Sequence, residues 1–575
     1  MSSASSRVIF LGLLLACLCV NGREGRAASA DDPQARPNIV FILVDDLGWT
    51  DVNPYAARPN QYYETPNITQ LAGQGISFTN AYTNSANCAP SRAALLSGQA
   101  YPNNPVYTVG SGARGKDKYR DLIPPENKET LPRDKITFAE RLQDAGYTTG
   151  FMGKWHLGEP PEAGPKQQGY DVNIGGFSTG RPSWSGGYFE PDNNPYIEDA
   201  RDGEYLTDFY TRKAVEFLED HQEEPFYLQL SYYSVHSPLQ APDARTAPFR
   251  QKSPVGGHSN ATYAAMIESV DRGVGRILSA LDRLGVQEET IVVFYSDNGG
   301  VDGEAVDHWS ATDNAPLRMG KGSFYEGGIR VPLIVRWPDV VPPGVTIDEP
   351  VIGTDLYPTL LDATKVPRAP NYSLDGESLL PLLRKPRTAT LSRENLYWHF
   401  PGYLNGNVQK GTWRTTPVSV IRSGKWKLLK FYEGNRLELY NLEQDIGENR
   451  NLKDKKPTVR RRLHQQLQHW LTENDAPMPT PETKSCQLPR ILIAPFGKGR
   501  RASRRFFSGV PSRRVYRTLA IGMRSCATQH FVNNDFWDRW MISKPISSMS
   551  SRTPPMRDLI GIGCSFRGDS GSGPE

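Results

Sequence analysis

Cysteine is scarce in the middle of this 575-residue sequence. Five of the six cysteines lie near the ends of the chain, at Cys17, Cys19, Cys486, Cys526 and Cys564. The remaining one, Cys88, has no cysteine near it with which to form an intrachain disulfide. Pro90 and Arg92 follow it closely, ahead of a stretch of small residues that could open a helix. This placement indicates a chemical role for Cys88 rather than a structural one.

Long apolar runs are also absent from the interior of the chain. No internal run reaches the roughly 18 residues that a membrane span needs, so we expect no transmembrane segment. Hydrophobic residues make up 38% and charged residues 22% of the sequence, which is typical of a soluble globular protein. A chain of this length has room for two or three domains and a large core.

The N-terminus has the pattern of a secretory signal peptide. Arg7 precedes the apolar run 8–20, which is too short to span a membrane, and Ala28-Ser29-Ala30 offers a small-residue cleavage site. We therefore predict a signal peptide over residues 1–30 and an exported protein, periplasmic or secreted. An N-terminal anchor helix and lipid attachment at Cys17 are the alternatives.

The C-terminal segment 484–575 differs in charge from the rest of the chain. It holds 13 Arg and 3 Lys against 4 Asp and 1 Glu, a formal charge of +11, whereas the whole chain carries only +3. Such a basic tail could bind polyanions. No helical or strand period persists through it, however, so we interpret it as disordered or as a stretch that does not belong to the fold. We expect no nucleic-acid partner.

Apolar runs and helical stripes alternate through the first part of the chain. Residues 39–44 and 291–295 are continuous apolar runs typical of strands buried on both faces, and 226–232 and 147–152 are predicted as further strands. Thr137 and Glu140 have capping-box spacing, and an amphipathic stripe runs from Tyr263 to Leu281 before Gly285. This alternation predicts an α/β catalytic domain over 31–387, with a large mixed, mostly parallel sheet between helices.

The pattern changes after about residue 387. Short apolar segments begin at Ser419, Trp426 and Leu437, and a helical stripe follows from Val459 to Leu471. These features predict a smaller C-terminal α+β subdomain over 388–483.

Acidic residues close two of the predicted strands. Asp45 and Asp46 end the first, and Asp297 and Asn298 end the strand near residue 295. Ligands collect at the carboxyl ends of parallel strands, and a hard cation such as Ca²⁺ or Mg²⁺ binds such oxygen ligands. Each pair alone could instead cap a helix or face a loop. Two pairs in the same context favour a metal site.

Cationic side chains accompany these acids. Arg92, Lys154 and Lys321 offer fixed positive charges, and His156 and His236 can titrate. Each alone is more often a solvated surface charge. Together with one metal ion, they suit an anionic tetrahedral group, sulfate or phosphate.

The sulfur of Cys88 fits this set poorly. A thiol hydrolase is one interpretation, and a phosphatase loop is another, but only three residues separate Cys88 from Arg92. A thiolate prefers soft metals rather than a hard dication. If residue 88 acts beside such a cation, its sulfur must therefore be chemically modified.

These residues match a known family. The segment Cys88-Ala-Pro-Ser-Arg-Ala-Ala-Leu-Leu-Ser-Gly98 resembles the sulfatase signature C-x-P-S-R-x-x-x-L-T-G, with Ser97 in place of threonine. The resemblance covers about residues 36–481 and includes Thr65-Pro-Asn-Ile, Gly153-Lys-Trp-His, Ser296-Asp-Asn-Gly-Gly and Leu439-Tyr-Asn-Leu. It implies an arylsulfatase-like enzyme with an alkaline-phosphatase-like fold. It also implies oxidation of Cys88 to Cα-formylglycine by a formylglycine-generating or anaerobic sulfatase-maturing enzyme.

The resemblance also implies a role for each site residue. Ca²⁺, rather than Mg²⁺, would be held by Asp45, Asp46, Asp297, Asn298 and one hydroxyl of the hydrated residue 88. Arg92 would hold that hydrate, and Lys154 and Lys321 would bind the sulfate oxygens. His236 would protonate the leaving alcohol, and His156 would deprotonate the second hydroxyl to release sulfate.

Two other functions remain open from the sequence. A phosphoester or phosphonate hydrolase of the same superfamily needs a similar site. A non-catalytic binder of sulfated glycans would result if Cys88 stayed unmodified. The expected substrate is a sulfated carbohydrate or an aryl sulfate. The loop 175–196, rich in glycine and aromatic residues, could stack on sugar rings or pack on itself.

Overall fold

The computed structural model describes residues 36–55, 62–302, 310–407 and 410–482. The predicted signal peptide, residues 1–30, and the basic tail, residues 484–575, lie outside the described residues. Within these ranges, no helix has both the length and the apolar character needed to cross a membrane.

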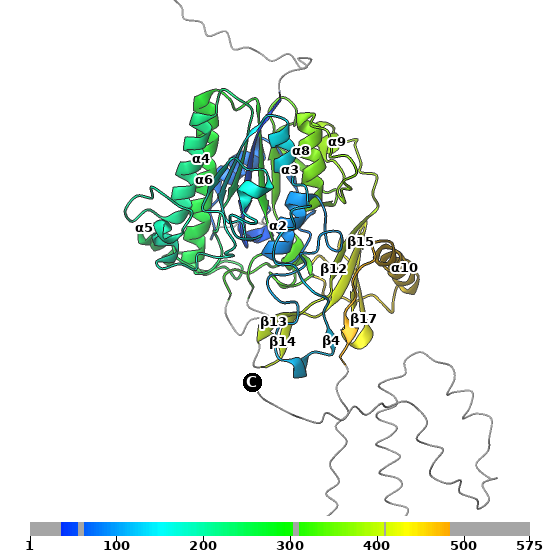
Figure 1. The fold of residues 1–575 in the computed structure, drawn as a ribbon. Helices are drawn as coiled ribbons and strands as arrows, with labels where there is room; N and C mark the ends of the chain where they lie inside the picture. The colour runs from blue at the N-terminus through cyan, green and yellow to red at the C-terminus, as the bar shows by residue number, and fades with distance from the viewer. Residues whose placement is uncertain (1–35, 56–61, 303–309, 408–409, 483–575) are drawn as a thin grey trace, which may run out of the picture. The chain divides into compact units, whose positions relative to one another are not determined.

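A large sheet lies at the centre of the described fold (Figure 1). Its eight strands follow the order β10-β2-β9-β8-β1-β7-β5-β6. Only β9 runs against its neighbours, because its pairings with β8 and β2 are antiparallel and the other pairings are parallel. The strands are β1 Asn38–Val44, β2 Ile76–Phe78, β5 Thr148–Gly153, β6 Val172–Ile174, β7 Phe226–Ser231, β8 Thr290–Ser296, β9 Leu333–Arg336 and β10 Val345–Ile347. The predicted mixed, mostly parallel sheet is thus confirmed.

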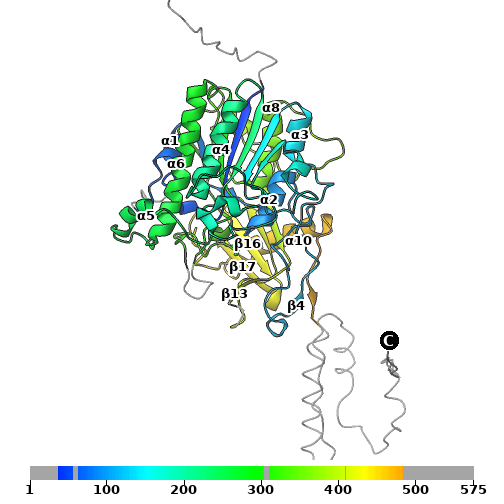
Figure 2. The ribbon, with the colours of Figure 1, turned by 60° about the vertical axis from the view of Figure 1, so that its left-hand side comes forward.

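Helices cover both faces of this sheet (Figures 1 and 2). Successive side chains of a strand point to opposite faces. Val40 and Ile42 of β1 accordingly join one hydrophobic core, whereas Ile39 and Phe41 join another. The first core lies against α1 Pro66–Gly73, α4 Leu206–Asp220, α5 Asp243–Arg250 and α6 Ala261–Leu284. The second lies against α2 Cys88–Ser97, α3 Phe138–Asp144, α8 Leu356–Thr364 and α9 Leu380–Arg384.

Local signals set the ends of these helices. The Thr137 hydroxyl accepts a hydrogen bond from the Glu140 amide, and the Glu140 carboxylate accepts one from the Thr137 amide, which completes the predicted capping box of α3. On the opposite face of the sheet, α6 ends before Gly285. The φ of this glycine is 74°, a left-handed conformation that glycine adopts at little cost.

A smaller antiparallel sheet follows in the chain. Its order is β12-β15-β16-β17, and one face packs on α10 Pro457–Glu473 (Figure 2). The strands are β12 Asn395–Phe400, β15 Val418–Ser423, β16 Trp426–Phe431 and β17 Arg436–Asn441. The structure thus has a smaller β-rich C-terminal region, as the sequence predicts.

Short elements complete the fold. The hairpin of β13 Leu404–Asn407 and β14 Thr412–Thr415 projects from the smaller sheet. The proline-rich segment near residue 480 also forms a strand, β18, which pairs with β4. The remaining elements are β3 Ala81–Tyr82, β4 Leu122–Ile123, α7 Glu326–Ile329, β11 Val351–Ile352 and β18 Thr480–Pro481.

Candidate active site

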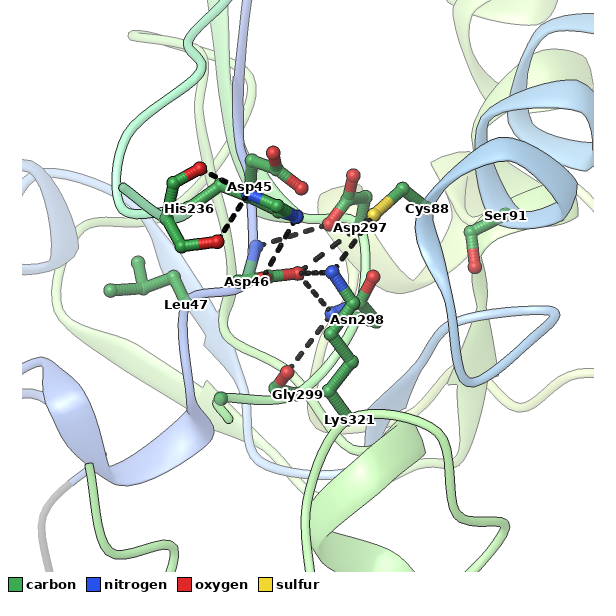
Figure 3. A network of polar contacts seen from close by, with 12 residues as sticks. Asp45, Asp46, Leu47, Cys88, Ser91, His236, Asp297, Asn298, Gly299 and Lys321 are labelled. Carbon is green, nitrogen blue, oxygen red and sulfur yellow. Dashed lines mark hydrogen bonds and ion pairs between the residues drawn. The ribbon is translucent and has the colours of Figure 1, made fainter. Parts of the chain in front are cut away.

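The carboxyl ends of neighbouring strands bring the predicted acids together (Figure 3). Strands β1 and β8 are parallel, with Val44 opposite Ser296, so Asp45 and Asp297 leave the sheet at the same level. The Asp46 amide donates a hydrogen bond to Asp297 Oδ1 at 3.2 Å, which ties the two strand ends together. All four predicted oxygen ligands, Asp45, Asp46, Asp297 and Asn298, are buried at this edge.

Helix α2 begins at Cys88 and aims its N-terminus at the same edge (Figure 3). Every residue of α2 is buried, and Cys88 is 2% exposed. Small side chains such as Ala93 and Ala94 allow this close packing of the helix. Cys88 and Arg92 are four residues apart, so both side chains lie on one face of α2. The amides of the first helical turn add positive potential near residue 88.

Each fixed cation of the site pairs with a different carboxylate. The Arg92 Nε lies 2.7 Å from Asp297 Oδ2, Lys154 Nζ lies 2.6 Å from Asp45 Oδ2, and Lys321 Nζ lies 2.6 Å from Asp46 Oδ1. Lys321 Nζ also lies 3.2 Å from Cys88 Sγ. Arg92 is held further by the Lys154 carbonyl and by Ser231 Oγ, a partner that sequence reasoning missed.

Several buried polar atoms at this site lack a hydrogen-bond partner among the described residues. They are Asp45 Oδ1, Arg92 Nη2, His156 Nδ1 and Asn298 Oδ1. A buried polar atom without a partner is costly, so each such atom calls for an explanation, and at this site a bound ion or ligand supplies one. Asp45, Asp46, Asp297 and Cys88 each offer one atom, all within 4.8 Å of one another, in a group that could hold a metal ion. The two orphaned oxygens therefore fit a cation that prefers oxygen ligands.

The electrostatics of the acids reflect burial and neighbouring charge. Burial raises the pKa of Asp297 to about 6, helped by the nearby charge of Asp45. Burial acts in the same direction on Asp46, but the charges of Lys321, His236 and Lys154 outweigh it and lower the Asp46 pKa. Burial also raises the pKa of the Cys88 thiol to about 12.

Both predicted histidines face the site. His236 Nε2 lies 3.6 Å from Asp46 Oδ2, and its Nδ1 lies 2.8 Å from the Ser237 carbonyl. Burial and the charge of Lys321 lower the pKa of His236 to about 3. Burial and the charge of Lys154 hold the pKa of His156 well below its usual value.

Two site residues hold a left-handed backbone. Asp46 has φ of 61° and His156 has φ of 63°, conformations that are uncommon outside glycine. Such strain persists where surrounding contacts over-determine it, and it concentrates at functional sites. Gly180 packs on the His156 ring so closely that a Cβ there would come within 2.3 Å of it.

The cavity over these residues has a volume of about 670 Å³. Asp46, Cys88, His156, His236 and Lys321 line it, together with residues that the sequence did not single out: Arg114, Arg181 and Arg414. All ten predicted site positions thus lie in or directly beside one pocket.

The loop 175–196 contributes less to the cavity than its aromatic content suggested. Phe177 packs on Trp184 and Tyr196, with ring centroids 6.2 and 5.5 Å apart, and Tyr188 is fully buried. Only the turn Thr179–Arg181 of this loop lines the cavity. These aromatic rings pack on one another and on Tyr205 and Tyr233.

Comparison with known proteins identifies the family. The Sulfatase family model matches residues 37–366, and the model of the N-sulphoglucosamine sulphohydrolase C-terminal region matches residues 319–474. A relative named Sulfatase from Formosa agariphila is 34% identical over 541 residues, covering 82% of this chain and 94% of that protein. Human N-acetylgalactosamine-6-sulfatase is 31% identical over 382 residues, covering 63% of this chain and 68% of its own length.

Solved structures share the fold. The crystal structure of Ps i-CgsB in complex with k-i-k-neocarrahexaose aligns with a TM-score of 0.63 and 30% identity, covering 78% of this chain and 95% of that one. The phosphonate monoester hydrolase of Agrobacterium radiobacter, 21% identical, aligns with a TM-score of 0.55 over 76% of this chain and 96% of its own, which shows the fold alone. These alignments confirm the expected fold class, an alkaline-phosphatase-like α/β fold with a large, mostly parallel sheet. With the matching family model and this site geometry, the chain belongs to the sulfatase family and is a sulfatase enzyme.

Proposed function

We propose that this sulfatase hydrolyses sulfate esters of carbohydrates, with Cys88 oxidised to Cα-formylglycine and Ca²⁺ bound beside it. The observation that carries the proposal is the position of residue 88. Its side-chain atom lies 3.2 Å from Lys321 Nζ and 3.8 Å from Asp46 Oδ1, at the N-terminus of α2 and at the floor of the cavity.

The ligand set supports both the cation and the oxidation. Asp45, Asp46, Asp297 and Asn298 would hold Ca²⁺ through oxygen atoms, and Asp45 Oδ1 and Asn298 Oδ1 are without partners among the described residues. A sulfur at residue 88 is the one donor that does not suit a hard cation, and oxidation replaces it with oxygen. When bound, Ca²⁺ lowers the pKa of a coordinated hydroxyl and neutralises the charge of the acids.

The remaining residues bind the sulfate and move protons. Lys154 and Lys321 would contact the sulfate oxygens as point charges, and Arg92, whose Nη2 has no partner, would orient residue 88. His236 would protonate the leaving alcohol from Nε2 as the imidazolium, because its Nδ1–H donates to the Ser237 carbonyl and a neutral ring would leave Nε2 without a proton; the negative charge of the bound sulfate would favour this protonated form. His156 would accept a proton from residue 88 when sulfate leaves.

The family relatives support a sulfated sugar as the substrate. Human N-acetylgalactosamine-6-sulfatase is named for a sulfated sugar, and the structure of Ps i-CgsB holds a neocarrahexaose. We propose a sulfated carbohydrate for this chain on that likeness. We also propose that the protein is exported to the periplasm or the medium, and that a formylglycine-generating or anaerobic sulfatase-maturing enzyme modifies Cys88.

The experiment is to measure sulfate release from 4-nitrophenyl sulfate and from a panel of sulfated sugars, with 4-nitrophenyl phosphate in parallel. The proposal expects hydrolysis of the sulfates with a higher kcat/KM than of the phosphate. A higher kcat/KM for the phosphate would favour the phosphoester hydrolase instead.

Mass spectrometry of the peptide containing residue 88 tests the oxidation, because the aldehyde is about 18 Da lighter than the thiol. Peptide of unchanged mass, with sulfated sugars bound but not hydrolysed, would favour the non-catalytic binder.

A further inference from the structure

Two arginines in the wall of the cavity have no role in the chemistry described above. Arg114 lies in the loop between α2 and β4. Arg414 lies on β14, in the β13–β14 hairpin that connects β12 to β15 of the smaller sheet. Both line the cavity that contains Cys88 and Lys321. The two residues are 300 positions apart in sequence and come from different parts of the fold.

The part of the chain that the structure describes offers neither guanidinium a carboxylate at ion-pair distance. Arg114 Nη2 donates to the Val109 carbonyl, and Arg414 Nη1 donates to the Lys321 carbonyl at 3.1 Å. Arg414 Nε is buried and has no hydrogen-bond partner. Each guanidinium carries five N–H donors, so most of the donors of both residues remain available to a ligand.

The two charges act on each other. Burial lowers the pKa of Arg414, and the charge of Arg114 lowers it further, while the charge of Asp46 opposes both. Burial likewise lowers the pKa of Arg114, opposed by Glu129 and Cys88. Two desolvated like charges in one cavity are unfavourable, and a bound anion relieves both their repulsion and their desolvation.

Surrounding contacts hold both side chains in place. Arg120 Nη1 donates to the carbonyls of Ala113, Arg114 and Gly115, each at 3.0 Å, which fixes the loop backbone. Gly115 packs on the Trp413 ring, beside Arg414, so the loop and the hairpin support each other. Arg414 itself lies against Gly322, where a Cβ would come within 2.7 Å of its Cδ. This is a fixed wall rather than a pair of solvated surface arginines.

We infer that Arg114 and Arg414 form a second anion subsite, which binds a further sulfate or carboxylate group of the same substrate. The inference rests on the proposed hydrolysis of sulfate esters in this cavity. The reacting sulfate would occupy the floor beside Cys88 and Lys321, and a cavity of about 670 Å³ has room for more of the sugar. Guanidinium groups bind sulfate and carboxylate oxygens in a bidentate manner. The preferred substrate is therefore a sugar that carries at least two anionic groups.

The test compares three disaccharides with one skeleton: one with a single sulfate, one with a second sulfate, and one with a single sulfate and a uronic carboxylate. We expect kcat/KM to be at least about tenfold higher for a doubly anionic disaccharide than for the monosulfated one. This factor corresponds to the free energy that hydrogen bonds to a charged group contribute. The doubly anionic disaccharide with the higher kcat/KM identifies whether the subsite binds sulfate or carboxylate.

The variant Arg114→Gln/Arg414→Gln should reduce this preference to within about twofold. The control Arg461→Gln removes an exposed arginine of α10 and should keep the wild-type preference. Equal kcat/KM values for the three disaccharides in the wild type would overturn the subsite, as would a double variant that lowers all three by the same factor.

If the double variant does not fold, the salt dependence of the wild type decides. Its preference should shrink when salt rises from about 0.05 M to about 0.5 M, and a salt-independent preference would contradict the inference.

Failure of the subsite and failure of the proposed function give different results. Turnover of 4-nitrophenyl sulfate without any preference for a second anion overturns only the subsite. If no sulfate ester is hydrolysed, calorimetric titration of the Cys88→Ala protein with the same three disaccharides tests the subsite alone. Tighter binding of a doubly anionic disaccharide supports it, and equal dissociation constants overturn it.

Discussion

Two of the clusters of buried charges among the described residues differ in one respect. The first is the catalytic cluster of Asp45, Asp46, Asp297, Arg92, Lys154 and Lys321. The second, which we call the junction cluster, comprises Glu326, Lys427, Glu448 and Arg330, and it joins α7 to the smaller sheet. Lys427 Nζ lies 2.9 Å from Glu326 Oε1 and 3.0 Å from Glu448 Oε1. Glu326 Oε2 accepts from Tyr82, and Glu448 Oε2 accepts from the Glu326 amide.

One oxygen of the junction cluster, Glu448 Oε1, makes no hydrogen bond among the described residues, but it lies 3.0 Å from the Lys427 ammonium, and the other carboxylate oxygens each have a donor. In the catalytic cluster, Asp45 Oδ1 and the neighbouring Asn298 Oδ1 have no partner among the described residues, and the cluster opens on the cavity. The burial of the acids is the same in both clusters. Burial of charge therefore does not by itself mark a functional site. Unused ligand atoms beside a cavity do.

The largest effect should come from residue 88. We expect Cys88→Ala to lower sulfate release by at least about 10³-fold, because the residue that supplies the nucleophile is lost. Cys88→Ser should form sulfated protein once and then stop, since serine has no second hydroxyl with which to expel sulfate. Intact mass and a steady-state assay measure both results. Rapid multiple turnover by Cys88→Ser would contradict the proposed mechanism.

Lys427→Met breaks the junction cluster. It leaves Glu326 and Glu448 buried without their shared cation, so the free energy of unfolding should fall by about 3 kcal/mol. The matched control Lys425→Met removes an exposed lysine two residues away, whose carboxylate neighbour lies 3.6 Å off, and should change stability by less than about 1 kcal/mol. Urea denaturation followed by fluorescence measures both. Similar losses for the two variants would remove the distinction between the clusters.

Calcium should stabilise only through the catalytic cluster. At about 100 times its dissociation constant, Ca²⁺ should add about 2.7 kcal/mol to the free energy of unfolding, because it binds the folded chain alone. Asp45→Asn should abolish most of this gain, whereas Lys427→Met should retain it. Thermal unfolding with chelator and then with added Ca²⁺ gives the measurement. An equal gain in Asp45→Asn would place the cation elsewhere.

The smallest effect concerns a fully partnered histidine of the smaller sheet. His399 contacts Ser419 Oγ and the Pro477 carbonyl, and burial lowers its pKa to about 4. The unfolded chain therefore binds the proton first, and stability should fall as the pH drops from about 6.5 towards 4, by about 1 kcal/mol per unit.

Replacement of this histidine gives the control. His399→Gln should reduce the slope over the same pH window by about 1 kcal/mol per unit, the remaining slope coming from His236 and His156, while the exposed His469→Gln should leave it as in the wild type. Urea denaturation of the three proteins at several pH values makes the comparison. Parallel pH dependences for His399→Gln and the wild type would show that His399 does not contribute.

Sequence reasoning found the acids of the catalytic cluster because they lie at the ends of apolar strands, whereas the roles of Arg92 on α2 and Lys321 in a loop came from the family resemblance. The apolar runs before Asp45 and Asp297 predict strands that are buried on both faces of the sheet. Parallel strands bring their carboxyl ends to one edge of that sheet. The capping box at Thr137 and the stop at Gly285 are equally local signals. The junction cluster has no such signal, since Lys427 and Glu326 are 101 residues apart and meet only through tertiary packing.

The second anion subsite was hidden for the same reason. Arg414 lies on a strand of four residues, too short to show a period, and Arg114 lies in a loop. Neither position differs in sequence from an ordinary surface arginine. Their shared cavity and the lack of carboxylate partners among the described residues became visible only in three dimensions.

The burial of Cys88 has a consequence for the timing of its oxidation. In the folded chain, residue 88 is 2% exposed and contacts Lys321, which is synthesised 233 residues later. At about 5–20 residues per second, the ribosome needs roughly 10–50 s to reach that lysine. If residue 88 is oxidised as we propose, a maturing enzyme would have at least this interval to find an open chain. Afterwards it would compete with folding itself, so faster folding would leave a larger fraction of molecules permanently inactive.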